Sequence, residues 1–288
     1  MAIIVEKPGV DGLVEAVAAL RDWQSEGVAW QLHPGDLGWF WRSGAEATAA
    51  AVRIWRRDGR ILAVGLLDGA DLLRVTTAPD VRRDEELARR LADDVIAPER
   101  GVLPAGKVSV EAPKDALLQD LLPGHGWQVD EEPWTPLNRD LSEPVKAPDL
   151  RIETIGPDKA AVWADVIGAA FDGSTFTAGK WQAMAAGTPY ADGRCLLGYD
   201  DHGDAIAAVA VWSAGPGKPG ILEPMGVHRD HRGHGHGKAI TLAAAAALQE
   251  LGSSSAALGT PSSNVAAVET YKSGGFRAQP EVWDLTRG

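Results

Sequence analysis

Two stretches of the sequence, roughly 150 residues apart, resemble each other. LRVTTAPDVR (73–82) parallels EPMGVHRDHR (223–232) at an offset of 223 − 73 = 150. Gly126 and Gly275, each followed by an aromatic residue, repeat at 275 − 126 = 149. Two separate anchors at nearly one offset indicate an internal repeat. The sequence therefore predicts two copies of one α/β unit, joined by the proline- and charge-containing segment SEPVKAPD (142–149).

Composition narrows the class of protein. With 45% hydrophobic residues and a formal charge of −12, the chain can bury a core and does not suit nucleic acid or an anionic membrane. The acidic balance is compatible with a cationic substrate such as an amine. Its single cysteine, Cys195, excludes an intrachain disulfide and is expected to be a buried apolar residue. Without a signal peptide or a long apolar run, the chain is expected to be soluble and cytoplasmic.

The stretch HRGHGHGKA (231–239) follows a predicted strand at 220–227 and opens a predicted helix. Glycines let the main chain turn and expose N–H groups at a helix N-terminus, where the dipole favours an anion such as a diphosphate. The stretch is neither a dinucleotide-type glycine turn nor a Walker loop, because Ala239 follows Lys238.

A metal site is the alternative interpretation of this stretch. The histidines have no tetrahedral spacing and the loop itself holds no carboxylate, so we expect no metal. The histidines concerned are His228, His231, His234 and His236.

A second motif follows: Asn264, Ala267, Tyr271, Gly275 and Phe276 match N-x-x-A-x-x-x-Y-x-x-x-G-F. With R-G-H-G-H-G (232–237) matching [RQ]-x-x-G-x-[GA], the chain over roughly 150–288 resembles the GNAT superfamily of acyl-CoA-dependent N-acyltransferases. The resemblance implies an α/β (α+β) class with two tandem GNAT-like domains, each a mixed, mostly antiparallel sheet flanked by helices. The expected domains are 1–145, degenerate, and 149–288, catalytic.

The resemblance implies acetyl-CoA as co-substrate and assigns residues to it. The main chain of Met225 and Val227 would bind the pantetheine arm, with Asn264 also contacting the cofactor. The loop that would hold the diphosphate comprises Arg232, Gly233, His234, Gly235, His236, Gly237 and Lys238.

The implied catalytic residues are Tyr271, as the acid beside the thioester sulfur, and Glu223, as a base on the preceding strand. Each assignment has a structural alternative. Tyr271 could be a core aromatic residue, Glu223 a solvated strand residue whose register Pro224 disturbs, and Asn264 a helix N-cap.

The first copy lacks these features. Its loop, VRRDEEL (81–87), has no glycine and three carboxylates, and Leu122 stands where 271 − 149 = 122 places the tyrosine. We therefore expect this copy to be structural or to contribute to the substrate site. The tandem architecture resembles that of mycothiol synthase and some antibiotic-modifying N-acetyltransferases. The tryptophan-rich run 30–41 is expected to pack between the copies, or alternatively to line an acceptor pocket.

The sequence thus predicts an acetyl-CoA-dependent N-acetyltransferase acting on a primary amine of a small molecule. The alternative is a non-catalytic acyl-CoA sensor or scaffold with tandem domains. No nucleic-acid or membrane partner is expected. The identity of the amine and the oligomeric state, a homodimer included, are left open.

Overall fold

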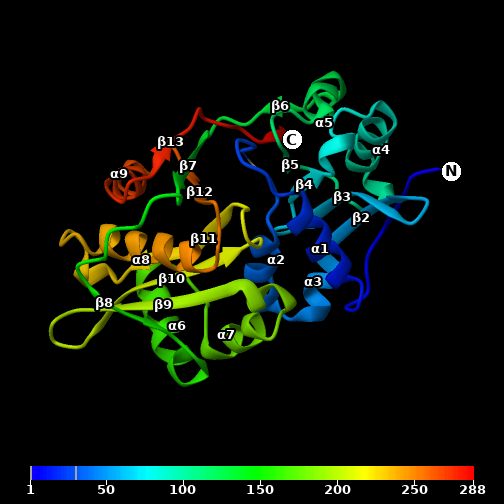
Figure 1. Ribbon diagram of the computed structural model, residues 1–288. Coiled ribbons are helices and arrows are strands. Elements are labelled where there is room, and N and C mark those ends of the chain that lie inside the picture. Colours follow the sequence, from blue (N-terminus) through cyan, green and yellow to red (C-terminus); the bar gives the residue numbers. More distant parts are fainter. Residues whose placement is uncertain (1, 30) are drawn as a thin grey trace. The chain divides into compact units, whose positions relative to one another are not determined.

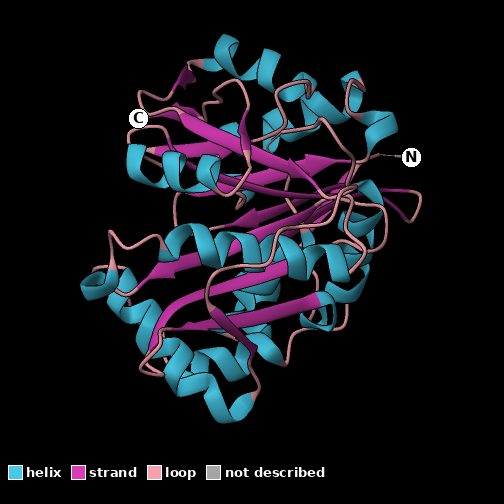
Figure 2. Cartoon of the chain, turned by 60° about the vertical axis from the view of Figure 1, so that its left-hand side comes forward, coloured by secondary structure: helices cyan, strands magenta, loops and turns pink. Residues whose placement is uncertain are grey.

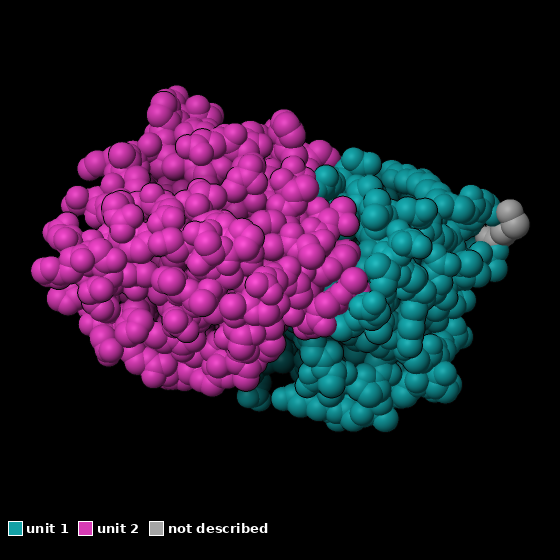
Figure 3. Space-filling model, turned by 90° about the horizontal axis from the view of Figure 1, so that it is seen from below, with its two compact units in different colours: residues 1–33, 46–134, 281–288 teal, residues 34–45, 135–280 magenta. Residues whose placement is uncertain are grey.

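The computed structural model describes residues 2–29 and 31–288, which form two compact units (Figure 3). Unit 1 comprises 1–33, 46–134 and 281–288, and unit 2 comprises 34–45 and 135–280. Each unit holds one seven-stranded mixed sheet flanked by helices (Figure 2). The α/β class with two tandem domains is therefore confirmed. No helix in the described ranges is both long and apolar enough to cross a bilayer.

In unit 1 the strand order is β1-β2-β3-β4-β5-β14-β6, and Figure 1 labels β2 to β6 of this sheet. The strands are β1 (Ile4–Glu6), β2 (Val52–Arg57), β3 (Arg60–Leu67), β4 (Leu72–Thr77), β5 (Val108–Glu111), β6 (Gln128–Val129) and β14 (Leu285–Arg287). The helices are α1 (Leu13–Trp23), α3 (Ala45–Ala51), α4 (Glu85–Ile96) and α5 (Leu117–Leu121).

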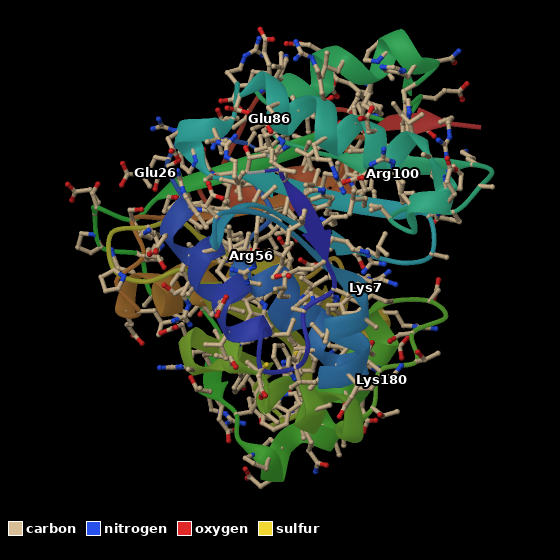
Figure 4. All side chains as sticks on the ribbon, turned by 90° about the vertical axis from the view of Figure 1, so that its right-hand side faces the viewer. Lys7, Glu26, Arg56, Glu86, Arg100 and Lys180 are labelled. Carbon is tan, nitrogen blue, oxygen red and sulfur yellow. The ribbon has the colours of Figure 1, made fainter. Side chains whose placement is uncertain are left out.

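Local chemistry explains two landmarks of unit 1. The β2–β3 hairpin turns at Asp58 and Gly59, with φ of 53° and 79°, as an Asp-Gly hairpin turn requires. Helix α4 begins where the Asp84 carboxylate accepts a hydrogen bond from the Leu87 N–H at 2.8 Å. Glu86 in its first turn forms an ion pair with Arg57 at 2.9 Å (Figure 4 labels Glu86).

In unit 2 the strand order is β13-β7-β12-β11-β10-β9-β8. The strands are β7 (Trp134–Asp140), β8 (Arg151–Thr154), β9 (Gly193–Tyr199), β10 (Ala205–Ser213), β11 (Gly220–Val227), β12 (Ser255–Pro261) and β13 (Arg277–Ala278). The helices are α2 (Pro34–Phe40), α6 (Ala160–Ala170), α7 (Ala178–Ala185), α8 (His236–Glu250) and α9 (Val265–Ser273).

The central strand β10 is covered on both faces. Its alternate residues Val209 and Val211 belong to a core cluster with helix α8, whereas Ala208 and Trp212 belong to a cluster with helices α6 and α7. Cys195 on β9 lies in the second cluster and is fully buried, and burial raises the pKa of its thiol to about 12. The structure therefore supports an apolar packing role for this cysteine.

The compact units differ from the expected ranges 1–145 and 149–288. Strand β7 precedes residue 145 in the sequence but lies in the sheet of unit 2 between β12 and β13. Strand β14, near the end of the sequence, lies in the sheet of unit 1 between β5 and β6. Strand patterns report local periodicity, but the sheet that a strand joins depends on non-local main-chain pairing.

Residues 34–51 form helices that the sequence analysis did not predict. Within the tryptophan-rich run, α2 belongs to unit 2, while Trp30 lies outside the described residues. Trp41 packs on Gly187, where an added Cβ would lie 2.7 Å from the indole. The run therefore contributes to the core of unit 2.

We expect Leu285→Ala to destabilise unit 1 although Leu285 stands at the other end of the sequence. The side chain is 4% exposed within the unit 1 core, so truncation should cost about 2–4 kcal/mol. Hydrogen exchange of β5 and β6 peptides would measure this opening. Val129→Ala, at a 60% exposed position of β6, is the matched control and should change stability by less than about 0.5 kcal/mol. If the β5 and β6 peptides were equally protected from hydrogen exchange in both variants, the placement of β14 between them would be contradicted.

Candidate functional site

Strand β11 is interrupted in the middle. Val209 of β10 pairs with Met225 and Val211 pairs with Leu222, so two residues, Glu223 and Pro224, stand opposite one. This two-against-one arrangement is a β-bulge, which bends a strand and redirects its side chains. The expectation that Pro224 disturbs the register is confirmed.

The parallel ladder between β11 and β12 is short. Among the described residues it joins Gly220 to Ala256 and Ile221 to Ala257, at the beginning of both strands. Met225 and Val227 lie further along β11, and their register partners on β10 are Val209 and Ala207. On the side that faces β12, the main chain of this half of β11 is thus outside the ladder. An extended ligand arm that binds to main-chain groups would require such an unpaired edge.

The glycine loop leads from β11 into α8. Gly233 and Gly235 have φ of 82° and 83°, the left-handed region that favours glycine, and an added Cβ at either would meet no atom within 4 Å. No main-chain N–H between Arg232 and Lys238 donates a hydrogen bond within the described chain. These N–H groups gather at the N-terminus of a fifteen-residue helix, an arrangement suited to an anion.

Gly237 has a different role from the other loop glycines. A Cβ there would lie 2.8 Å from Thr270 Cγ2, so the missing side chain lets the first turn of α8 approach α9. This approach fixes the loop relative to the helix that carries Tyr271.

The Arg232 side chain turns away from the exposed N–H groups. Its Nη2 donates to the carbonyl of Ala170 at 2.6 Å, at the end of α6, and its Nε donates to the carbonyl of Val227 at 3.4 Å. The neighbouring Arg229 bonds Ala169 in the same way at 2.8 Å. Arg232 therefore joins the end of β11 to α6 through two of its guanidinium nitrogens.

Tyr271 and Glu223 come close enough to interact electrostatically. The tyrosine is 9% exposed on α9, and Glu223 is half-buried in the bulge. Burial, and secondarily the negative charge of Glu223, raise the pKa of Tyr271 to about 12. The phenol is thus protonated throughout the neutral range, and the structure brings together the two residues that the sequence analysis assigned to catalysis.

Other candidate residues lie around this centre. Asn264 is the N-cap of α9, since its side chain accepts from the Ala267 N–H at 3.2 Å. The half-buried Met225 accepts a hydrogen bond at its sulfur from Thr241 at 3.2 Å. Lys238 and His234 are exposed, and the His234 and His236 rings lie 6.0 Å apart.

The two remaining histidines of the loop region, His228 and His231, also pair with each other, at 5.4 Å between ring centroids. Across residues 2–29 and 31–288, no group of three or more histidine, cysteine or acidic side chains is arranged to hold a metal ion.

Sequence reasoning missed Trp212. Its indole Nε1 donates to the main-chain carbonyl of Glu223 at 2.8 Å, inside the bulge. Pro224 signalled an interrupted strand, but no local pattern signals a donor eleven residues earlier in the chain.

Unit 1 differs from unit 2 around the corresponding strand and loop. Its β3–β4 ladder runs without a register shift, and its parallel ladder β4–β5 extends to the pair Arg74–Glu111. These two side chains also form an ion pair at 2.9 Å, with Glu111 buried. The helix that follows is capped by Asp84, where unit 2 has glycines, and Leu122 is buried.

Comparisons with known proteins agree with this geometry. Residues 169–276 match the model of the acetyltransferase (GNAT) family. No curated protein sequence matches the chain significantly. Among solved structures, a GCN5-related N-acetyltransferase from Sphaerobacter thermophilus has a TM-score of 0.58 at 19% identity, covering 99% of this chain and 95% of the other.

Two further solved structures have the same fold over the whole chain. A GNAT-family acetyltransferase from Colwellia psychrerythraea has a TM-score of 0.62 at 15% identity, covering 100% of both chains. A tandem GNAT protein from the clavulanic acid biosynthesis pathway has a TM-score of 0.59 at 14% identity, covering 99% of this chain and 98% of the other. The chain therefore has the tandem GNAT fold, with the family signature in unit 2.

We expect Glu223→Gln to lower the pKa of Tyr271, because it removes the negative charge that disfavours the tyrosinate. The shift should be modest, since burial is the larger cause. Rapid pH-jump absorbance titration, with Tyr271→Phe to identify the signal, would measure it. The control Glu153→Gln removes a charge beside Tyr199 and should leave the Tyr271 signal unchanged. An unchanged Tyr271 titration in Glu223→Gln would contradict the proximity.

Proposed function

We propose that unit 2 transfers the acetyl group of acetyl-CoA to a primary amine of a small molecule by direct attack. The glycine loop would hold the diphosphate of the co-substrate through main-chain N–H groups of Gly233 to Lys238. Met225 and Val227 would bind the pantetheine arm through their main chain, and Asn264 would contact it while capping α9. This co-substrate and this chemistry belong to the family whose model matches residues 169–276.

One observation carries the proposal. A buried, protonated tyrosine lies near a carboxylate on a strand bulge, and that strand leads directly into a loop whose N–H groups have no acceptor within the described chain. An acetyl-CoA molecule bound at the loop and along β11 would bring its thioester toward Tyr271 and Glu223. Structural packing alone does not require this combination.

The proton transfers follow from the two side chains. The amine is a cation at neutral pH, so Glu223 would accept its proton before attack. The amine nitrogen then bonds the thioester carbonyl carbon, and the carbon–sulfur bond breaks. Tyr271 would donate its proton to the departing sulfur. The tyrosinate would then recover a proton from the nitrogen of the tetrahedral adduct, which becomes the neutral amide, and Glu223 would release its proton to solvent. With its raised pKa the Tyr271 phenol is protonated at neutral pH and can act as this proton donor.

The acceptor is proposed from the charge of the chain and from one solved structure of the same fold. A formal charge of −12 is compatible with a cationic acceptor. One structure of the same fold, at 15% identity, is described as a glucosamine N-acetyltransferase region. Unit 1, whose helix α4 is capped by the Asp84 carboxylate where unit 2 has glycines, would not bind acetyl-CoA.

Thiol release from acetyl-CoA across a panel of small amines tests the activity. Release that depends on a particular amine, with an acetylated product, supports the proposal. Binding of CoA without release on any amine would instead favour a non-catalytic acyl-CoA sensor.

Tyr271→Phe should lower kcat by at least about 100-fold, because the general acid is lost while the ring remains. The dissociation constant of CoA should stay within about twofold, measured by calorimetry. Tyr199→Phe removes another buried hydroxyl of the same unit, one that lies beside Glu153, and should leave kcat unchanged. Equal kcat in the two variants would show that Tyr271 is a core aromatic residue.

Gly235→Ala should weaken CoA binding about tenfold. At φ of 83° an alanine is strained by about 1–2 kcal/mol, so the loop would relax and its N–H groups would lose their alignment. The control Gly203→Ala places the same strain, at φ of 87°, in the β9–β10 turn and should leave affinity unchanged. Unaltered affinity in Gly235→Ala would argue against the loop as the diphosphate site.

A further inference from the structure

The hydrogen bond between Trp212 and Glu223 occupies an unusual place in the sheet. Trp212 lies on β10 with its main chain opposite Ile221, and its side chain is 1% exposed. The indole N–H reaches the Glu223 carbonyl at 2.8 Å, within the segment where β11 leaves the regular register. A bulge disrupts the local ladder, and a buried main-chain carbonyl needs a donor in place of its ladder partner.

The indole is held from two sides by glycines. A Cβ on Gly38 would lie 2.5 Å from Trp212 Cζ3, and a Cβ on Gly193 would lie 2.9 Å from Trp212 Cε3. The Tyr190 ring contacts it edge-on at 5.9 Å between centroids. A ring so enclosed cannot change rotamer without moving its neighbours, so the position of its N–H is fixed.

Gly38 ties this arrangement to the N-terminal part of the sequence. It lies on α2, within residues 34–45 of unit 2, and is buried. Helix α2 therefore sets where the indole can lie, although it precedes the rest of unit 2 by about ninety residues.

We propose that Trp212 is a positioning residue that holds the bulge at Glu223 and so aims its carboxylate toward Tyr271 and the incoming amine. Helix α2, through Gly38, fixes the indole that performs this task. This inference rests on the proposed acetyltransfer for its catalytic consequence, but its structural part stands independently. It gives residues 34–45 a role in the unit that carries the candidate site.

Trp212→Phe removes the indole N–H together with part of the ring volume, so it is compared with a control that loses the same volume. We expect kcat to fall roughly tenfold, since a buried carbonyl loses its donor and the bulge relaxes. The acid limb of the kcat/KM profile for the amine should shift, because Glu223 changes its surroundings. The dissociation constant of CoA should remain within about twofold, as the glycine loop is untouched.

Trp163→Phe is the matched control. Trp163 is a fully buried tryptophan of the same unit, and its indole nitrogen has no hydrogen-bond partner within the described chain. The substitution loses the same ring volume without losing a hydrogen bond, so kcat and the pH profile should stay as in the wild type.

Gly38→Ala is a second, independent variant. Its methyl group would displace the indole, so we expect the same loss of kcat with retained CoA affinity. Gly179→Ala adds a methyl to another helical glycine of unit 2, whose nearest neighbour is 3.8 Å away, and should have no effect.

Crystal structures of Trp212→Phe and Gly38→Ala test whether Trp212 holds the bulge at Glu223, and they need no activity assay. We expect the register between β10 and β11 to change around Glu223. A bulge unchanged in both variants overturns the proposal, even if kcat falls, and so does a kcat and pH profile equal to that of Trp163→Phe. If the wild-type protein transfers no acetyl group, the proposed function fails, while the register in the variants still decides whether Trp212 holds the bulge.

Discussion

The site depends on the main-chain interruption of β11 at Glu223. A strand in full register would place its side chains at a regular period and would pair its whole length with both neighbours. The bulge breaks the period, and the parallel ladder to β12 joins only the first residues of both strands. A carboxylate, a protonated tyrosine and the entrance to a glycine loop thereby meet in one unit.

The two units show how one fold can carry different chemistry. In unit 2, glycines with positive φ expose N–H groups before α8. In unit 1, Asp84 caps the corresponding helix, and Arg74 with Glu111 continues the ladder that unit 2 ends early. A carboxylate at a helix N-terminus stabilises that helix and repels an anionic ligand. Asp84 therefore stabilises the helix of unit 1 and disfavours diphosphate binding there.

Much of the candidate site was predictable because its determinants are local. Glycines at 233 and 235 are required by backbone conformation, Asn264 caps the helix that follows it, and Pro224 signals an interrupted strand. The closeness of Glu223 and Tyr271, by contrast, followed only from the family resemblance. Their separation of 48 residues carries no pattern that would indicate contact (271 − 223 = 48).

The sequence by itself determined the repeat, the two motifs and the difference between the loops of the two copies, since each is read from short stretches of neighbouring residues. Only the tertiary structure decided that β7 and β14 each join the sheet formed mainly by the other half of the sequence. It also decided that α2 encloses Trp212 through Gly38. The physical reason is that strand pairing and glycine-mediated packing use main-chain groups and missing side chains, which leave almost no signature in a linear pattern.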